Sequence, residues 1–127
     1  MQQHSQCERI TQRIEAVYGI LPEYLWLDSP ESAVFRHPAS RKWFGITMRV
    51  AKCRLGLAGD APADVLNVKC DPILIGSLRR EPGFLPAYHM NKNTWISILL
   101  DETVPDARIE FLLDLSYELV APRIKKR

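Results

Sequence analysis

Basic side chains are concentrated in the first half of the sequence, where their chemistry would be the binding of an anion. Six lysines and arginines, and no acidic residue, lie between Ser32 and Gly59. Arginine and lysine contact nucleic-acid phosphates, and a basic region attracts polyanions. Charge alone nevertheless favours a simpler interpretation, in which these residues form the solvated surface of strands and turns. The residues that would contact phosphates are Arg41, Lys42, Arg49, Lys52, Arg54 and Lys69, with Lys92 and the basic C-terminal tail as additions.

Two tryptophans alternate with basic and polar residues on predicted strands, where their chemistry would be stacking. Aromatic rings beside arginine and lysine can stack on bases or anchor a protein partner. Large aromatic side chains are usually buried, so residues 84–93 or the connector 20–32 could instead cover both tryptophans and make a second small core. The sequence leaves these two interpretations open. The alternation places on one outward face of the sheet Trp43, Thr47, Arg49, Asn67, Lys69, Trp95 and Ser97.

No group of residues has the spacing of a known catalytic set. The sequence lacks glycine-rich phosphate-binding strings, the GxSxG string of a serine nucleophile and the HExxH string of a zinc enzyme. His89 and Cys70 could act as base and nucleophile, but nothing fixes their separation, and Cys70 is predicted to point into the core. The acidic pair Asp101–Glu102 falls in a predicted turn, where it would be solvated. We therefore expect a protein that is not an enzyme and needs no cofactor.

The three cysteines and three histidines are too scattered to indicate a disulfide framework or a metal site. The cysteines lack C-x-x-C spacing, and structural zinc needs about four ligands at recognisable spacing. Unpaired cysteines are typical of a reducing compartment, so we expect a cytoplasmic protein. The polar N-terminus lacks the apolar segment of a signal peptide, and no run approaches the 18 or so apolar residues of a membrane span, so no membrane attachment is expected.

Three helices are predicted among the elements that position these residues. An S-x-x-E capping box at Ser5 predicts a helix over roughly residues 6–18. The string Asp71–Pro72 starts a short second helix, because aspartate caps a helix and proline fits its first position. A third helix starts at Pro105–Asp106, and its apolar residues recur at helical spacing until Pro122 ends it.

Four strands are predicted at residues 34–37, 43–50, 64–70 and 94–100. Their period-two alternation favours an antiparallel sheet, which amphipathic helices would cover on one face. The fold class is therefore α+β in two layers, with an antiparallel sheet of about four strands and the terminal helices packed on one face. The expected core comprises Ile14, Val17, Phe44, Ile46, Met48, Val50, Leu66, Val68, Ile96, Ile98, Leu112, Leu113 and Tyr117.

Length and composition favour one globular domain over residues 1–127. Apolar residues make up 46% of the chain and charged residues 25%, and the formal net charge is only +2. This balance is usual for a soluble domain and excludes a disordered chain, which would lack the apolar side chains needed to offset chain entropy.

The string Pro86-Ala87-Tyr88-His89-Met90-Asn91-Lys92, with Trp95 three residues on, is the most specific motif in the chain. With Lys42-Trp43-Phe44 and Asn67-Val68-Lys69-Cys70-Asp71-Pro72, it resembles the MmcQ/YjbR family of small bacterial proteins. Thr94 departs from the family form, in which a histidine precedes the tryptophan. The resemblance implies a frataxin-like (CyaY-like) α+β fold and DNA binding, described for the family as a double-wing arrangement.

Three functions follow as hypotheses for a chain expected to be a monomer. The first is DNA binding through phosphate and shape contacts, with a hairpin at residues 51–61 as one wing, since no helix-turn-helix is predicted. The second is a protein partner on the exposed sheet face. The third is a small-molecule site beneath residues 84–93, with His89 and Asn91 as polar contacts. The patch for the last two comprises Trp43, Asn67, His89, Asn91 and Trp95.

Overall fold

The first helix, α1 (Gln6–Tyr18), has the bounds that its capping box predicts. The Ser5 hydroxyl accepts a hydrogen bond from the Glu8 amide at 3.1 Å, and the Glu8 carboxylate accepts one from the Ser5 amide at 3.3 Å. Gly19 adopts a left-handed φ of 69° and ends the helix. The computed structural model describes residues 4–123, so the lysines of the basic tail lie outside the described residues.

Five strands form one sheet in the order β1-β2-β3-β5-β4, and every neighbouring pair is antiparallel. The strands are β1 (Ala33–Arg36), β2 (Trp43–Ala51), β3 (Pro62–Lys69), β4 (Phe84–Pro86) and β5 (Trp95–Leu99). The expectation of about four strands missed β4, which is too short to show alternation and ends in a proline. Proline lacks an amide donor and is tolerated at a sheet edge, where β4 lies.

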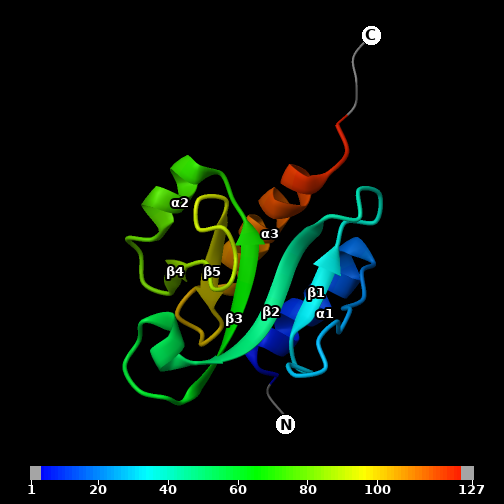
Figure 1. Ribbon diagram of the computed structural model, residues 1–127. Helices are drawn as coiled ribbons and strands as arrows, with labels where there is room; N and C mark the ends of the chain where they lie inside the picture. Colours follow the sequence, from blue (N-terminus) through cyan, green and yellow to red (C-terminus); the bar gives the residue numbers. More distant parts are fainter. Residues whose placement is uncertain (1–3, 124–127) are drawn as a thin grey trace.

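Within the described residues, three α-helices and one short 3₁₀-helix accompany the sheet (Figure 1). The helix α2 (Pro72–Leu78) follows β3, α3 (Asp106–Val120) ends the fold, and the 3₁₀-helix η1 (Lys52–Leu55) follows β2. Asp71 caps α2 by accepting a hydrogen bond from the Ile73 amide at 2.9 Å. No helix within residues 4–123 is long and apolar enough to cross a membrane.

The larger core lies between the sheet and the helices α1 and α3, which Figure 1 shows on one side of it. Ile10 and Ile14 of α1 pack there with Leu113 of α3. The prediction that Val17 joins this core is wrong, because its side chain is 48% exposed. The apolar stripe of α1 continues instead through Tyr18, which lies four residues after Ile14. The Tyr18 ring packs against the rings of Phe44 and Tyr117, with centroid distances of 5.4 and 4.5 Å.

A bulge in β2 inverts the predicted alternation. Arg36 pairs with Trp43 while Phe35 pairs with Gly45, so Phe44 has no partner on β1. Phe44 and Gly45 consequently both face the helices. Every later side chain of β2 is shifted to the other face, because a slip of one residue reverses the pleat. The expectation that Ile46, Met48 and Val50 face the helices is therefore wrong, and Gly45, Thr47 and Arg49 face them instead.

The second face of the sheet carries its own apolar core instead of an open polar surface. One cluster comprises Val34, Ile46, Ala87 and Trp95, and a second comprises Val50, Leu55, Ala63, Val65 and Leu99. Residues 87–94, which connect β4 to β5, and the 3₁₀-helix η1 supply part of the cover. Trp95 is only 8% exposed. Of the two interpretations that the sequence left open, the second small core is the one the structure has.

Candidate functional site

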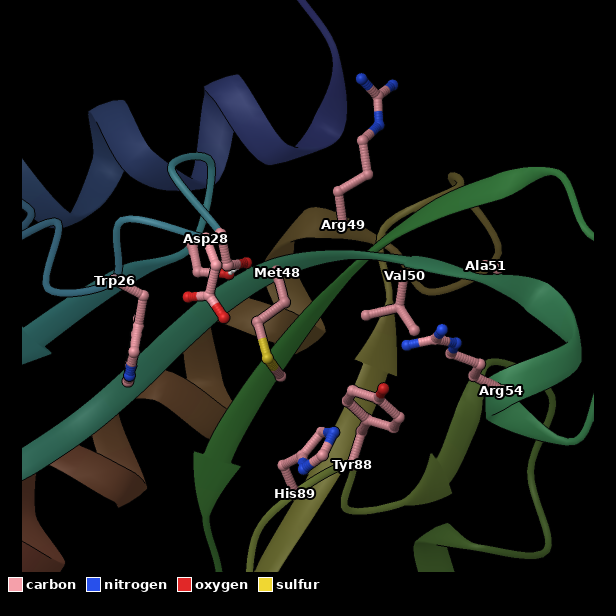
Figure 2. A pocket seen from close by; sticks show the side chains of 11 residues that line it. Trp26, Asp28, Met48, Arg49, Val50, Ala51, Arg54, Tyr88 and His89 are labelled. Carbon is pink, nitrogen blue, oxygen red and sulfur yellow. Dashed lines mark hydrogen bonds between the residues drawn. The ribbon is translucent and has the colours of Figure 1, made fainter.

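Two adjoining pockets open on this second face and share three lining residues. The main pocket, with a volume of about 570 Å³, lies between the connector 20–32, the second half of β2 and the residues that follow β4 (Figure 2). The side pocket, about 390 Å³, lies between η1 and the residues that follow β4. Arg54, Tyr88 and His89 line both. The two pockets therefore meet at these three side chains.

A buried hydrogen-bond network fixes the wall that Tyr88 and His89 form. The side-chain amide of Asn67 donates to the Tyr88 carbonyl at 2.9 Å, and the Tyr88 amide donates to the Ser97 hydroxyl at 2.9 Å. The Ser97 hydroxyl donates in turn to the Asn67 side-chain oxygen. Both Asn67 and Ser97 are fully buried. The network satisfies both backbone groups of Tyr88, so neighbouring strands hold the start of this loop in one place.

His89 stands in an unusual backbone conformation at the junction of the two pockets. Its φ of 59° lies in the left-handed region, which costs a non-glycine residue roughly 1–3 kcal/mol and often occurs at functional sites. The imidazole is exposed and meets the Tyr88 ring edge-on, with centroids 4.1 Å apart. Figure 2 shows both rings on the pocket side of β2. The backbone strain is therefore located where a ligand would touch the protein.

The floor of the main pocket is apolar, and its far wall is polar. Met48 and Val50 form the floor because the bulge turns their side chains toward this face. Asp28, Ser29 and Ser32 line the far wall, where the two serine hydroxyls lie 2.7 Å apart. Trp26 closes this end and packs edge-on against Trp43, with ring centroids 6.0 Å apart. A ligand here would have an apolar surface beneath it and hydrogen-bonding groups at both ends.

The two arginines of the main pocket differ in what they can do. Arg49 extends to the opposite side of β2 from Met48 and Val50 (Figure 2), and its guanidinium lies 3.5 Å from the Asp64 carboxylate. Arg54 is exposed, and no carboxylate lies within 4 Å of its guanidinium in the described part of the chain. Arg54 is thus the arginine of this pocket that is free to bind a ligand.

The seven basic residues proposed for nucleic acid do not gather on one surface. Arg41 and Lys42 lie in the turn before β2, and Lys69 ends β3 beside the same end of the sheet. Lys52 and Arg54 lie on η1 at the far end of β2, about 26 Å away for a strand of this length. Lys92 lines the side pocket with Arg54. Six of the seven basic residues therefore form two separate groups of three, and Arg49 faces the helices apart from both.

The five residues predicted as a contact patch also separate into different roles. His89 lines both pockets, whereas Asn67 and Trp95 are buried beneath the wall that they support. Trp43 is half-buried and packs on Trp26. Asn91 is a turn residue, since its side-chain oxygen accepts from the Asn93 amide at 2.8 Å. Only His89 is therefore placed to touch a ligand in the pockets.

His89 and Cys70 cannot act as a base and nucleophile pair. Cys70 is buried in the core on the helix side of the sheet, whereas His89 lies on the other face. Burial also raises the pKa of the Cys70 thiol, which disfavours the reactive thiolate. Within residues 4–123, no group of three or more histidine, cysteine, aspartate or glutamate side chains could hold a metal ion.

The sequence alone does not identify several of the residues that line the main pocket. Trp26, Ser29 and Ser32 belong to a connector without alternation or a motif, although its apolar string Tyr24-Leu25-Trp26-Leu27 could have indicated a covering role. The sequence alternation places Met48 on the other face, because a bulge has no sequence signal as strong as the alternation itself.

The fold and the pockets define a small α+β protein, with helices on one face of a five-stranded antiparallel sheet and a pocket on the other. The chain belongs to the YjbR family, whose family model matches residues 15–119. It is 40% identical to the Bacillus subtilis protein YyaQ over 112 residues, which cover 88% of this chain and 95% of YyaQ.

Solved structures of proteins from Pseudomonas syringae and Deinococcus radiodurans share the fold. A crystal structure of a Pseudomonas syringae protein matches with a TM-score of 0.88 and 36% identity, over 90% of this chain and 97% of that one. The Deinococcus radiodurans protein DR2400 matches with a TM-score of 0.69 and 25% identity, over 91% of this chain and 78% of that one.

Proposed function

We propose that the protein binds a small organic molecule in the main pocket. The observation that carries this function is the fixed wall at Tyr88 and His89, which a fully buried network of Asn67 and Ser97 holds. A volume of about 570 Å³ falls within the range of small-molecule sites, roughly 300–1,000 Å³. An apolar floor with a few polar groups at its ends is also typical of such sites.

This function is favoured over a protein partner on the sheet face by the burial of that face. Asn67 and Trp95, two of the five residues expected to contact a partner, are inaccessible beneath residues 87–94. Two pockets open on this face, and a concave site is better suited to a small ligand than to a flat protein surface.

Binding of the neutral fluorescent probe N-phenyl-1-naphthylamine tests the pocket. We expect it to bind the wild type, and Met48→Gln to weaken binding roughly fivefold to tenfold, because the floor loses apolar contact. The matched control is Leu119→Gln, since Leu119 is a half-exposed leucine in a smaller apolar groove between α2 and α3. The proposal fails if the probe does not bind, or if Leu119→Gln weakens it and Met48→Gln does not.

Duplex DNA is a second candidate, favoured by three cations at one end of the molecule. Lys52, Arg54 and Lys92 lie at η1 and the side pocket, and none has a carboxylate partner in residues 4–123. The connection between β2 and β3 would then act as the wing that the family resemblance implies.

A salt titration with two labelled duplexes of unrelated sequence tests the DNA hypothesis. Three phosphate contacts predict a slope of about −2.7 for log K against log salt, the same for both duplexes. We expect Lys52→Glu to weaken binding of both duplexes. Arg80→Glu changes an exposed arginine outside both pockets and serves as the charge-matched control. Absence of binding at low salt, or equal effects of the two variants, would rule this candidate out.

We also infer that the fold is of the frataxin-like (CyaY-like) type. Two terminal helices, α1 and α3, pack together on one face of an antiparallel sheet, and this arrangement supports the inference. A fold does not carry its function with it, so this likeness adds no ligand to the proposal.

A further inference from the structure

We infer that the ligand of the main pocket is an organic anion whose charged group is held by Arg54, where the two pockets meet, and by Lys92 of the side pocket. This inference rests on the proposed small-molecule function. It specifies the ligand as an apolar or aromatic body that carries a carboxylate, sulfonate or phosphate group.

The charge of the junction supports an anion. The side pocket is lined by Arg54, His89 and Lys92 and by no acidic residue. Five arginine side chains elsewhere in the fold lie within 4 Å of a carboxylate, as Arg49 does with Asp64 and Arg108 with Glu81, whereas Arg41, Arg79 and Arg80 are exposed away from both pockets. Arg54 and Lys92 have no such partner within 4 Å among residues 4–123, so their charges are available to a ligand. Charge-assisted hydrogen bonds to a carboxylate, sulfonate or phosphate are among the strongest that a protein makes.

The far end of the main pocket carries a negative charge instead of a positive one. Asp28, the one acidic residue that lines it, lies across the floor from Arg54, with Met48 and Val50 between them (Figure 2). An anionic group would be repelled at the Asp28 end and attracted at the Arg54 end. The ligand is therefore oriented, with its apolar body on the floor and its charged group toward the side pocket.

Two probes that share one aromatic body separate the contribution of the charge. 8-Anilinonaphthalene-1-sulfonate differs from N-phenyl-1-naphthylamine by its sulfonate, so the ratio of their dissociation constants reports the anion site. We expect the sulfonate probe to bind wild-type protein about tenfold more tightly, as one charge-assisted contact implies. In Arg54→Gln the ratio of the two dissociation constants should fall severalfold toward one, because the guanidinium that holds the sulfonate is gone.

Two further variants exclude a general effect of net charge or unfolding. Arg80→Gln removes the same charge at an exposed site outside both pockets and should leave the ratio unchanged. Asp28→Asn should strengthen binding of the sulfonate probe by about twofold, because a like charge near the pocket is removed. Thermal unfolding of each variant confirms that the probes report a folded protein, since loosely packed states also bind the sulfonate dye.

The outcomes distinguish this inference from the function on which it rests. If the two probes bind the wild type equally, or if Arg54→Gln and Arg80→Gln change the ratio alike, the anion inference is overturned while the pocket function stands. If neither probe binds, the pocket function itself is overturned.

Discussion

Replacing Asn67 by alanine is expected to lower the free energy of unfolding by about 2–4 kcal/mol and to abolish tight probe binding. The substitution leaves the Tyr88 carbonyl and the Ser97 hydroxyl without their buried partner. Each unsatisfied buried group costs about 1–3 kcal/mol. Because Asn67 is fully buried, water cannot readily replace the lost contacts. Urea denaturation measures the stability change, and titration with N-phenyl-1-naphthylamine measures the effect on the pocket wall.

Asn91→Ala is the matched control for this change. Asn91 is an exposed asparagine of the same loop, and its side chain accepts one hydrogen bond from the Asn93 amide within a turn. We expect it to cost less than about 1 kcal/mol and to leave probe affinity within twofold of the wild type. Similar losses in the two variants would show that the buried network does not position Tyr88 and His89.

The second large effect is expected at Gly83, where alanine should cost about 2–4 kcal/mol of unfolding free energy. Gly83 has a φ of 89°, a conformation that L-residues with a Cβ rarely adopt. A Cβ there would lie 2.6 Å from the Val104 Cγ2 atom, which requires the neighbouring turn to move. The Gly83 carbonyl also accepts a hydrogen bond from the Leu99 amide at 2.8 Å, so movement would disturb the start of β4.

Gly76→Ala is the control for this substitution, because the added Cβ would meet no neighbouring side chain. Apart from its chain neighbours and the backbone of its own helix, no atom lies within 4 Å of a Cβ built on Gly76, which is exposed on α2. Alanine is the better helix former, so this variant should be more stable than the wild type by up to about 1 kcal/mol. Thermal and urea unfolding of the two variants give the test. Equal stability of Gly83→Ala and the wild type would contradict the packing described around Val104.

The elements of the fold could be predicted from the sequence because local signals determine them. The capping box at Ser5 and the Asp71–Pro72 string mark where α1 and α2 begin, and both signals act within four residues. The long strands β2 and β3 span nine and eight residues, enough for a period-two sequence pattern to indicate a strand. The strand β4 has three residues and forms through its pairing with β5, which no local pattern could reveal.

The sequence could not predict which side chains of β2 face the helices, because the bulge in β2 arises from its pairing with β1. Nothing in Trp43-Phe44-Gly45 marks Phe44 as the unpaired residue. One inserted residue was enough to move Met48 and Val50 from the expected helix side to the floor of the main pocket. The sequence motif did lead to His89, whereas Trp26 and Ser32 reach the pocket only because the chain folds the connector over the sheet.

The charge distribution along the sequence also does not predict which basic residues lie on the same surface. Arg41 and Lys42 are separated from Lys52 and Arg54 by the whole length of β2, although they are close in sequence. Lys92, far from Arg54 in sequence, lines the same pocket. Strand direction and loop packing decide which charges lie together, and neither can be read from a count of charges.

A crystal structure of the complex with 8-anilinonaphthalene-1-sulfonate tests the central claim most directly. The aromatic rings are expected on Met48 and Val50, with the sulfonate within hydrogen-bonding distance of the Arg54 guanidinium. A complex in which the dye occupies the groove beside Leu74 and Leu119, with the main pocket free of it, would contradict the proposed binding site.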